Sequence, residues 1–66
     1  MNAGKVFRAL RENKHISRKE LAKNSGLSLQ TIIKIELDYT KPSAYTIFKL
    51  SSALGVEELE LVKIFK

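Results

Sequence analysis

Apolar residues recur at intervals of three and four along most of this chain, which is the spacing of one face of an α-helix. In the first segment, Ala3, Val6, Phe7 and Leu10 follow this spacing. No segment alternates apolar and polar residues with a sustained period of two, so a β-sheet has no support. The pattern predicts an all-α fold, and its short connections are typical of a compact five-helix bundle.

Helix-capping and helix-breaking residues divide this pattern into five segments. Ser17 and Glu20 have the spacing of a capping box, and Ser28 and Ser43 stand where they can cap two later helices. Gly26 tolerates the left-handed backbone that ends many helices. The expected helices lie within residues 3–13, 17–26, 28–38, 43–55 and 56–65, with Asp38 and Gly55 at helix ends and Pro42 before the fourth helix. The expected inward-facing residues of the third and fourth helices are Ile32, Ile35, Ile47, Leu50, Ser51 and Leu54.

A chain of 66 residues has room for one hydrophobic core, so residues 1–66 are predicted to form a single domain. The absence of Cys and the presence of a single His remove the atoms needed for disulfides, a zinc finger or a thiol nucleophile. No nucleophile has an evident base, and there is no Gly-rich phosphate loop. We therefore expect no enzymatic activity, no metal or other cofactor and no small-molecule ligand.

The longest stretch without a charged residue covers residues 24–33, which is ten residues, whereas a membrane-spanning helix needs about 18. The N-terminal segment carries Lys5, Arg8 and Arg11 and lacks the uninterrupted apolar stretch of a signal peptide. We expect a cytoplasmic protein that makes no membrane contact.

Positive charge is concentrated in the first half of the chain. The whole chain has a net charge of +5; residues 1–34 hold eight basic and two acidic groups, and residues 35–66 hold four basic and five acidic groups. This asymmetry favours a polyanionic partner for the first half, although a merely solvated basic surface gives the same count.

The segment from Arg18 to Leu37 has the spacing of a helix-turn-helix. Two helices that cross at roughly 90–120° need a small residue where they approach, a glycine at the turn and apolar residues between them. Ala22 and Gly26 meet the first two needs. The apolar contacts are expected from Leu21, Leu27, Ile32 and Ile35.

On these residues, the chain resembles the phage repressor and Cro-like helix-turn-helix regulators, also called the xenobiotic-response-element (XRE) family. The resemblance runs from about Gly4 to Leu61 and implies a lambda-repressor-like DNA-binding domain, with its helix-turn-helix at about residues 17–37. It also implies a structural ion pair between Arg11 and Glu36. The motifs that carry it are Phe7-Arg8, Leu10-Arg11, Ile16-Ser17, Glu20-Leu21-Ala22, Gly26-Leu27-Ser28, Thr31-Ile32, Ile35-Glu36, Pro42 and Leu54-Gly55-Val56.

The resemblance implies that the third helix, residues 28–37, lies in the major groove of double-stranded DNA. Gln30 can exchange hydrogen bonds with adenine, Lys34 can donate to guanine, and Leu29 can pack on a thymine methyl group. Free amides at helix starts and cationic side chains are suited to phosphate. The expected base contacts are Ser28, Leu29, Gln30, Ile33 and Lys34, and the expected phosphate contacts are Ser17, Arg18, Lys19 and Lys41.

Two features depart from the family pattern. Arg18 stands where the family usually has Gln. The arginine is suited to phosphate binding, but it lacks the side-chain amide with which Gln can brace a neighbouring side chain. Leu29, Ile33 and Leu37 form an apolar row where polar residues are commoner. The row indicates either a protein contact or packing of Ile33 and Leu37 against the fourth helix or its preceding loop.

These observations favour a transcriptional regulator, specifically a repressor, that binds a palindromic operator as a homodimer. The apolar residues of the last helix exceed what a small core needs, so we expect the dimer interface at Leu61, Ile64 and Phe65. The alternative is a protein-interaction module, such as an antitoxin-like or regulatory subunit, that uses the row Leu29, Ile33 and Leu37.

Overall fold

The structure, a computed structural model, describes residues 2–66, and every regular element within this range is an α-helix. This confirms the all-α prediction. None of these helices is long and apolar enough to cross a membrane. The five helices are α1 (Ala3–Asn13), α2 (Arg18–Ser25), α3 (Leu29–Glu36), α4 (Ala44–Leu54) and α5 (Glu58–Phe65).

Short-range hydrogen bonds fix where most of these helices begin. The Ser17 hydroxyl accepts from the Glu20 amide at 3.1 Å, and the Glu20 carboxylate accepts from the Ser17 amide at 2.9 Å, so the capping box is complete. The hydroxyls of Ser28 and Ser43 accept from the amides three residues later and start α3 and α4. The expected helix starts at these three serines are confirmed.

Residues with a left-handed backbone follow the ends of four helices, and the one after α1 is His15, with φ 59°. Gly26 has φ 76° and Gly55 has φ 70°, while Asp38 has φ 62°. The last helix differs from expectation, because α5 begins at Glu58 and not at Val56. The Val56 amide instead donates to the Ser51 carbonyl at 3.0 Å, as in a Schellman motif, so Val56 belongs to the end of α4.

The helices pack as a closed ring in the order α1, α3, α2, α4, α5 and back to α1. The ring surrounds one core to which every helix contributes, and the full molecule measures 26 × 22 × 22 Å. The buried apolar residues of this core are Phe7, Leu21, Ala22, Ile32, Ile35, Ile47, Leu50, Leu54, Leu61 and Phe65.

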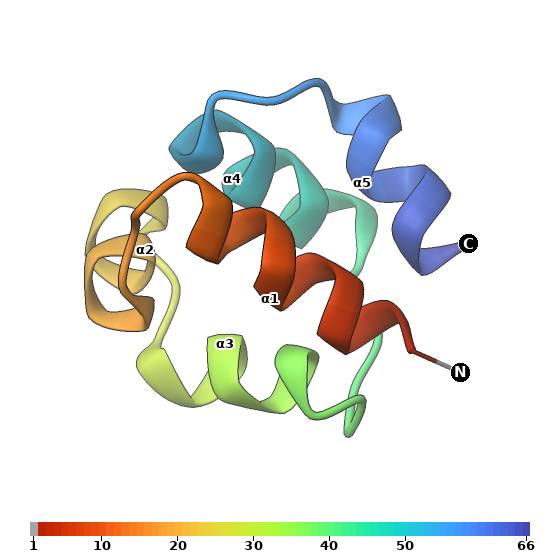
Figure 1. The fold of residues 1–66 in the computed structure, drawn as a ribbon, viewed down its shortest axis with the longest axis horizontal. Coiled ribbons are helices and arrows are strands. Elements are labelled where there is room, and N and C mark those ends of the chain that lie inside the picture. The colour runs from red at the N-terminus through yellow and green to blue at the C-terminus, as the bar shows by residue number, and fades with distance from the viewer. Residues whose placement is uncertain (1) are drawn as a thin grey trace.

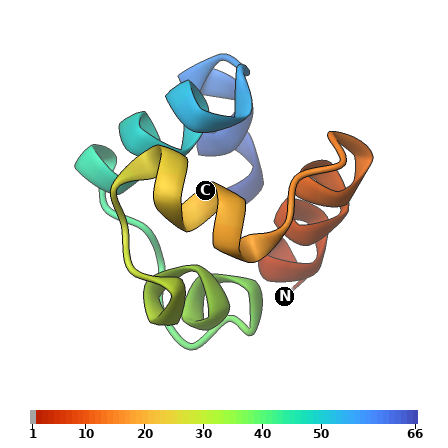
Figure 2. The same ribbon diagram turned by 90° about the vertical axis from the view of Figure 1, so that its left-hand side faces the viewer.

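Helix α3 lies at one edge of the ring. It runs along the bottom of the molecule in both ribbon views, beneath α1 and α2, and no other helix passes below it (Figure 1, Figure 2). Its main packing partners are α1 and α2, whereas α5 packs on α1 and α4. One long side of α3 is therefore left uncovered.

The expected interface residues of α5 require a correction. Leu61 is 0% exposed and Phe65 is 5% exposed, and the Phe65 ring lies 5.6 Å from the Phe7 ring, centroid to centroid. Ile64 is half-buried beside them. Because α5 closes the core between α1 and α4, these residues are needed inside the molecule. The exposed apolar side chains of α5 are Leu59 and Val62.

Candidate nucleic-acid interface

The Glu36 carboxylate holds α3 against α1. It accepts from Arg11 Nε at 2.7 Å and from Arg11 Nη2 at 3.2 Å, and the two side chains are only 1% and 7% exposed. Arg11 Nη1 donates to the Ile16 carbonyl at 2.8 Å, which also fixes the segment before α2. The structure thus contains the ion pair that the resemblance implied, and Arg11 joins α1 to the end of α3 and to the segment before α2.

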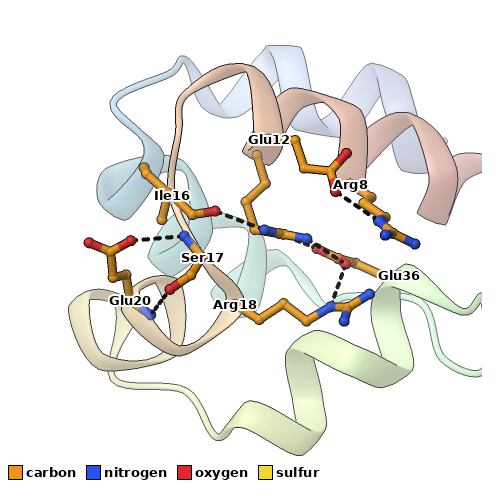
Figure 3. A network of polar contacts seen from close by, with 8 residues as sticks. Arg8, Glu12, Ile16, Ser17, Arg18, Glu20 and Glu36 are labelled. Carbon is orange, nitrogen blue, oxygen red and sulfur yellow. Dashed lines mark hydrogen bonds and ion pairs between the residues drawn. The ribbon is translucent and has the colours of Figure 1, made fainter.

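A second arginine shares the same carboxylate. Arg18 Nε donates to Glu36 Oε1 at 2.9 Å, and the Arg18 side chain is 35% exposed (Figure 3). The sequence reasoning missed this contact, because the two residues are 18 positions apart and no local pattern links them. Two guanidinium groups around one carboxylate keep a net positive charge between α2 and α3.

The start of α1 is fixed to the end of α3. The Gly4 amide donates to Asp38 Oδ1 at 2.9 Å, in place of a cap from a neighbouring residue. Gly4 also has no room for a side chain, since a Cβ there would collide with the Glu36 carbonyl and lie 2.7 Å from the Ile35 carbonyl oxygen. The signal for this contact was a lone Gly inside a helical pattern, which often marks close backbone approach.

These contacts, from Gly4 and Arg11 of α1 and from Arg18 of α2, hold the C-terminal end of α3 and leave its outer face free. Ser28, Leu29, Gln30 and Lys34 are exposed, and Ile33 is half-buried. Gln30 and Lys34 are four residues apart, so their side chains share one side of the helix. Four of the five residues expected to contact bases are therefore exposed on the uncovered side of α3, and Ile33 lies at its margin. Such an exposed second helix, held across a glycine turn, is the geometry of a major-groove reader.

The sequence profile of the helix-turn-helix family matches residues 7–61. The chain belongs to this family. A relative from Sinorhizobium fredii, named uncharacterized HTH-type transcriptional regulator y4dJ, is 36% identical over 59 residues, which cover 89% of this chain and 77% of that protein. No solved structure matches the chain. The resemblance to the Cro and repressor-like regulators is confirmed, and the protein is a DNA-binding regulator of transcription of the helix-turn-helix class.

In this helix-turn-helix protein, the residues expected to bind phosphate lie at the start of α2 and just after α3. Lys19 and Lys41 are exposed. Only Nε of Arg18 hydrogen-bonds to Glu36, which leaves the two terminal amino groups of the guanidinium for an anion. Ser17 is less available, since its amide already donates to Glu20 and its hydroxyl caps α2.

Ser28, one of the expected base contacts, also has a structural role. The Ser28 hydroxyl accepts from the Thr31 amide and lies 2.8 Å from the Thr31 hydroxyl, so it stabilises the start of α3. Within residues 2–66, no three metal-binding side chains come together. The site consists of a polar and apolar helix face flanked by cations.

The apolar row does not pack as one of our two interpretations required. Leu37 is 52% exposed, Leu29 is 39% exposed and Ile33 is half-buried. Packing of these residues against α4 or its preceding loop is therefore wrong for Leu37, whereas the half-buried Ile33 is compatible with it. The helix-turn-helix protein thus has two exposed apolar side chains, Leu29 and Leu37, along its second motif helix, with the half-buried Ile33 between them.

Proposed function

We propose that the protein binds a specific double-stranded operator through α3 and acts there as a repressor. The observation that carries this proposal is the uncovered face of α3, with Gln30 and Lys34 projecting from it beside cationic side chains. We propose no catalytic step, no cofactor and no small-molecule ligand for the protein, and we place the protein in the cytoplasm with its DNA.

In the proposed complex, α3 lies in the major groove with its N-terminal residues toward the base edges. Gln30 exchanges two hydrogen bonds with an adenine, and Lys34 donates to O6 or N7 of a guanine. The cations on either side bind the phosphate backbone and fix the position of the helix. The proposed phosphate contacts are Arg18, Lys19 and Lys41, with the first-turn amides of α2 beside Ser17. Ser28 lies at the start of α3, where this helix enters the major groove.

We propose further that two copies bind a palindromic operator. Half-sites of such operators are about 34 Å apart, which exceeds the 26 Å longest dimension of this molecule. One copy therefore reaches one half-site, and a two-fold dimer reaches both.

A groove between α4 and α5 provides the surface for this dimer. Its apolar lining comes from Ala44, Ile47, Leu59 and Val62. Helix α5 is acidic at its start and basic at its end, with Glu57, Glu58 and Glu60 before Lys63 and Lys66. Two antiparallel copies of α5 place the acidic end of each beside the basic end of the other, which favours pairing through this face.

The test of DNA binding is selection of duplexes from a random pool, followed by affinity measurement at several salt concentrations. We expect an enriched palindrome and an affinity that falls steeply with salt, because bound cations release counterions from the phosphates. Gln30→Ala and Lys34→Ala are expected to cost about 1–3 kcal/mol each on the selected site. Lys49→Ala, which removes a lysine from α4, is the matched control and is expected to change little.

Failure to enrich any motif at low salt contradicts the proposal. The alternative, a protein-interaction module, is then favoured. It predicts the opposite effects of single substitutions on binding. In that case binding to a protein partner depends on Leu29 and Ile33 and is insensitive to Gln30→Ala.

A further inference from the structure

The outer side of α3 carries apolar side chains beside its polar ones, of which Leu29 and Leu37 are exposed and Ile33 is half-buried. Leu29, Ile33 and Leu37 follow each other at intervals of four residues, so they form one row along the helix. Gln30 and Lys34 are each one position further along and form the adjacent row. Isolated exposed leucines are ordinary on protein surfaces, but a continuous row inside a binding face is a recognition feature.

The bases offer one apolar partner to such a row. In the major groove, every base edge presents hydrogen-bond donors or acceptors, and only thymine adds a methyl group, at C5. An apolar side chain against any other base covers polar atoms without bonding to them, which is unfavourable. A thymine methyl group, by contrast, gains from being covered.

We propose that Leu29 and Ile33 make the operator half-site specific for thymine by packing on two thymine methyl groups. This inference rests on the proposed function, because it assumes that α3 enters the major groove. Leu37 is excluded from the methyl contacts, since it follows the last turn of α3 and the N-terminal part of such a helix meets the base edges.

The helix spacing fixes how far apart the two thymines lie. Four residues advance an α-helix by about 6 Å. Successive base pairs are about 3.4 Å apart, so Leu29 and Ile33 face positions about two base pairs apart. Gln30, next to Leu29, prefers adenine on the same grounds of edge chemistry. The half-site is therefore rich in A·T pairs where the start of α3 lies.

The charges around the row favour DNA over an apolar protein surface as its partner. Lys34 lies beside the row, and Arg18 with its net positive cluster lies between α2 and α3. A dry protein interface would have to bury these cations or leave them at its rim, whereas a duplex neutralises them with phosphates while its methyl groups meet the leucine and isoleucine.

The test uses duplexes that differ only in the methyl group. The selected operator is compared with copies in which single thymines are replaced by deoxyuridine, which keeps the same pairing and lacks the C5 methyl. We expect two positions in each half-site where replacement weakens binding about fourfold, which corresponds to ~0.8 kcal/mol at 1.4 kcal/mol per tenfold. Other thymines are expected to be replaceable without loss.

Variants assign each methyl group to its side chain. With Leu29→Ala the uracil penalty is expected to vanish at one position, and with Ile33→Ala at the other. Val6→Ala, which trims an exposed apolar residue of α1, is expected to keep both penalties. Gln30→Ala is expected to weaken thymine and uracil duplexes by the same factor. Circular dichroism confirms that each variant is folded before binding is measured.

Each contrary result has a distinct meaning. Selection without any enriched duplex overturns the proposed function and this inference with it. Specific binding to a site without thymines, or equal binding to thymine and uracil duplexes, overturns the methyl contact while DNA recognition stands. Uracil penalties that persist in both Leu29→Ala and Ile33→Ala also overturn it, because the methyl groups then act through DNA shape.

Discussion

Glu36 is the residue on which the position of α3 depends most. Its carboxylate is almost fully buried and accepts hydrogen bonds from Arg11 and Arg18, which come from α1 and α2. A buried carboxylate between two guanidinium groups is retained only because all three groups hydrogen-bond well. The Arg11–Glu36 pair is thus structural, and its loss is expected to lower stability and to disturb the orientation of α3.

Glu36→Gln is expected to destabilise the fold by about 3–5 kcal/mol, since it leaves the Arg11 guanidinium buried without its counter-charge. The matched control is Glu12→Gln, which breaks the exposed Arg8–Glu12 pair at 3.1 Å and is expected to cost about 0.3–0.5 kcal/mol. Urea unfolding of the three proteins measures both differences. Equal losses in the two variants would show that burial of the Glu36 cluster adds nothing.

Gly4 controls the distance between α1 and α3. Ala is the better helix former, so a Gly-to-Ala change inside an open helix gains about 1 kcal/mol. At Gly4, however, the added methyl group meets the backbone carbonyls of Ile35 and Glu36, which cannot move without shifting α3. Gly4→Ala is expected to lose about 1–3 kcal/mol in urea unfolding, as overpacked sites do. A gain in stability would contradict the close approach of the two helices.

At the scale of helices, local signals were sufficient for most boundaries. Three helices begin at a serine that accepts a hydrogen bond from the amide three residues later, namely Ser17, Ser28 and Ser43. The groups that form each cap are therefore close together in the sequence. The contacts that fix α3 were harder to predict: Gly4 lies 34 positions from Asp38, and Arg18 lies 18 from Glu36. Only the fold brings such residues together, and only the resemblance implied the Arg11–Glu36 pair.

The last helix shows a second limit of prediction from sequence patterns. Its helical period was clear from the sequence, but periodicity alone does not say which apolar residues a small core takes up. Leu61 and Phe65 pack inside, while Leu59 and Val62 remain outside. Helix α5 does have apolar residues beyond those that the core uses, but they are Leu59 and Val62, on a different side of the helix from the predicted ones.

The turn between α2 and α3 needs Gly26 for its backbone and not for space. Its φ is 76°, and no atom outside its immediate neighbours lies within 4 Å of an added Cβ. Gly26→Ala is therefore expected to cost about 1–2 kcal/mol from left-handed backbone strain alone, and Gly26→Asn less. Urea unfolding measures the cost, and the selected operator should be unchanged. A shifted operator preference in a folded Gly26→Ala variant would indicate that the turn itself had moved.

At the scale of the whole molecule, the ring of helices separates the proposed DNA-binding surface on α3 from the proposed dimer surface on α4 and α5. Helix α3 packs on α1 and α2, whereas α4 packs on α2 and α5, and α5 packs on α1 and α4, so α3 makes its main contacts with neither helix of the proposed dimer groove. Substitutions on the outside of α5 should therefore alter assembly without disturbing α3. This separation allows the dimer to be tested independently of base recognition.

Val62→Lys is expected to weaken dimerisation on the order of 100-fold, because the two-fold axis brings like charges from both copies into one apolar seam. Sedimentation equilibrium measures the dimer, and binding to a full palindrome and to one half-site measures the consequence. We expect unchanged affinity for the half-site and loss of the advantage of the palindrome. Val6→Lys, which adds the same charge at an exposed apolar position of α1, should keep both the dimer and the advantage. If both variants stay dimeric, the α4–α5 groove is not the interface; if both become monomeric, added charge alone explains the effect.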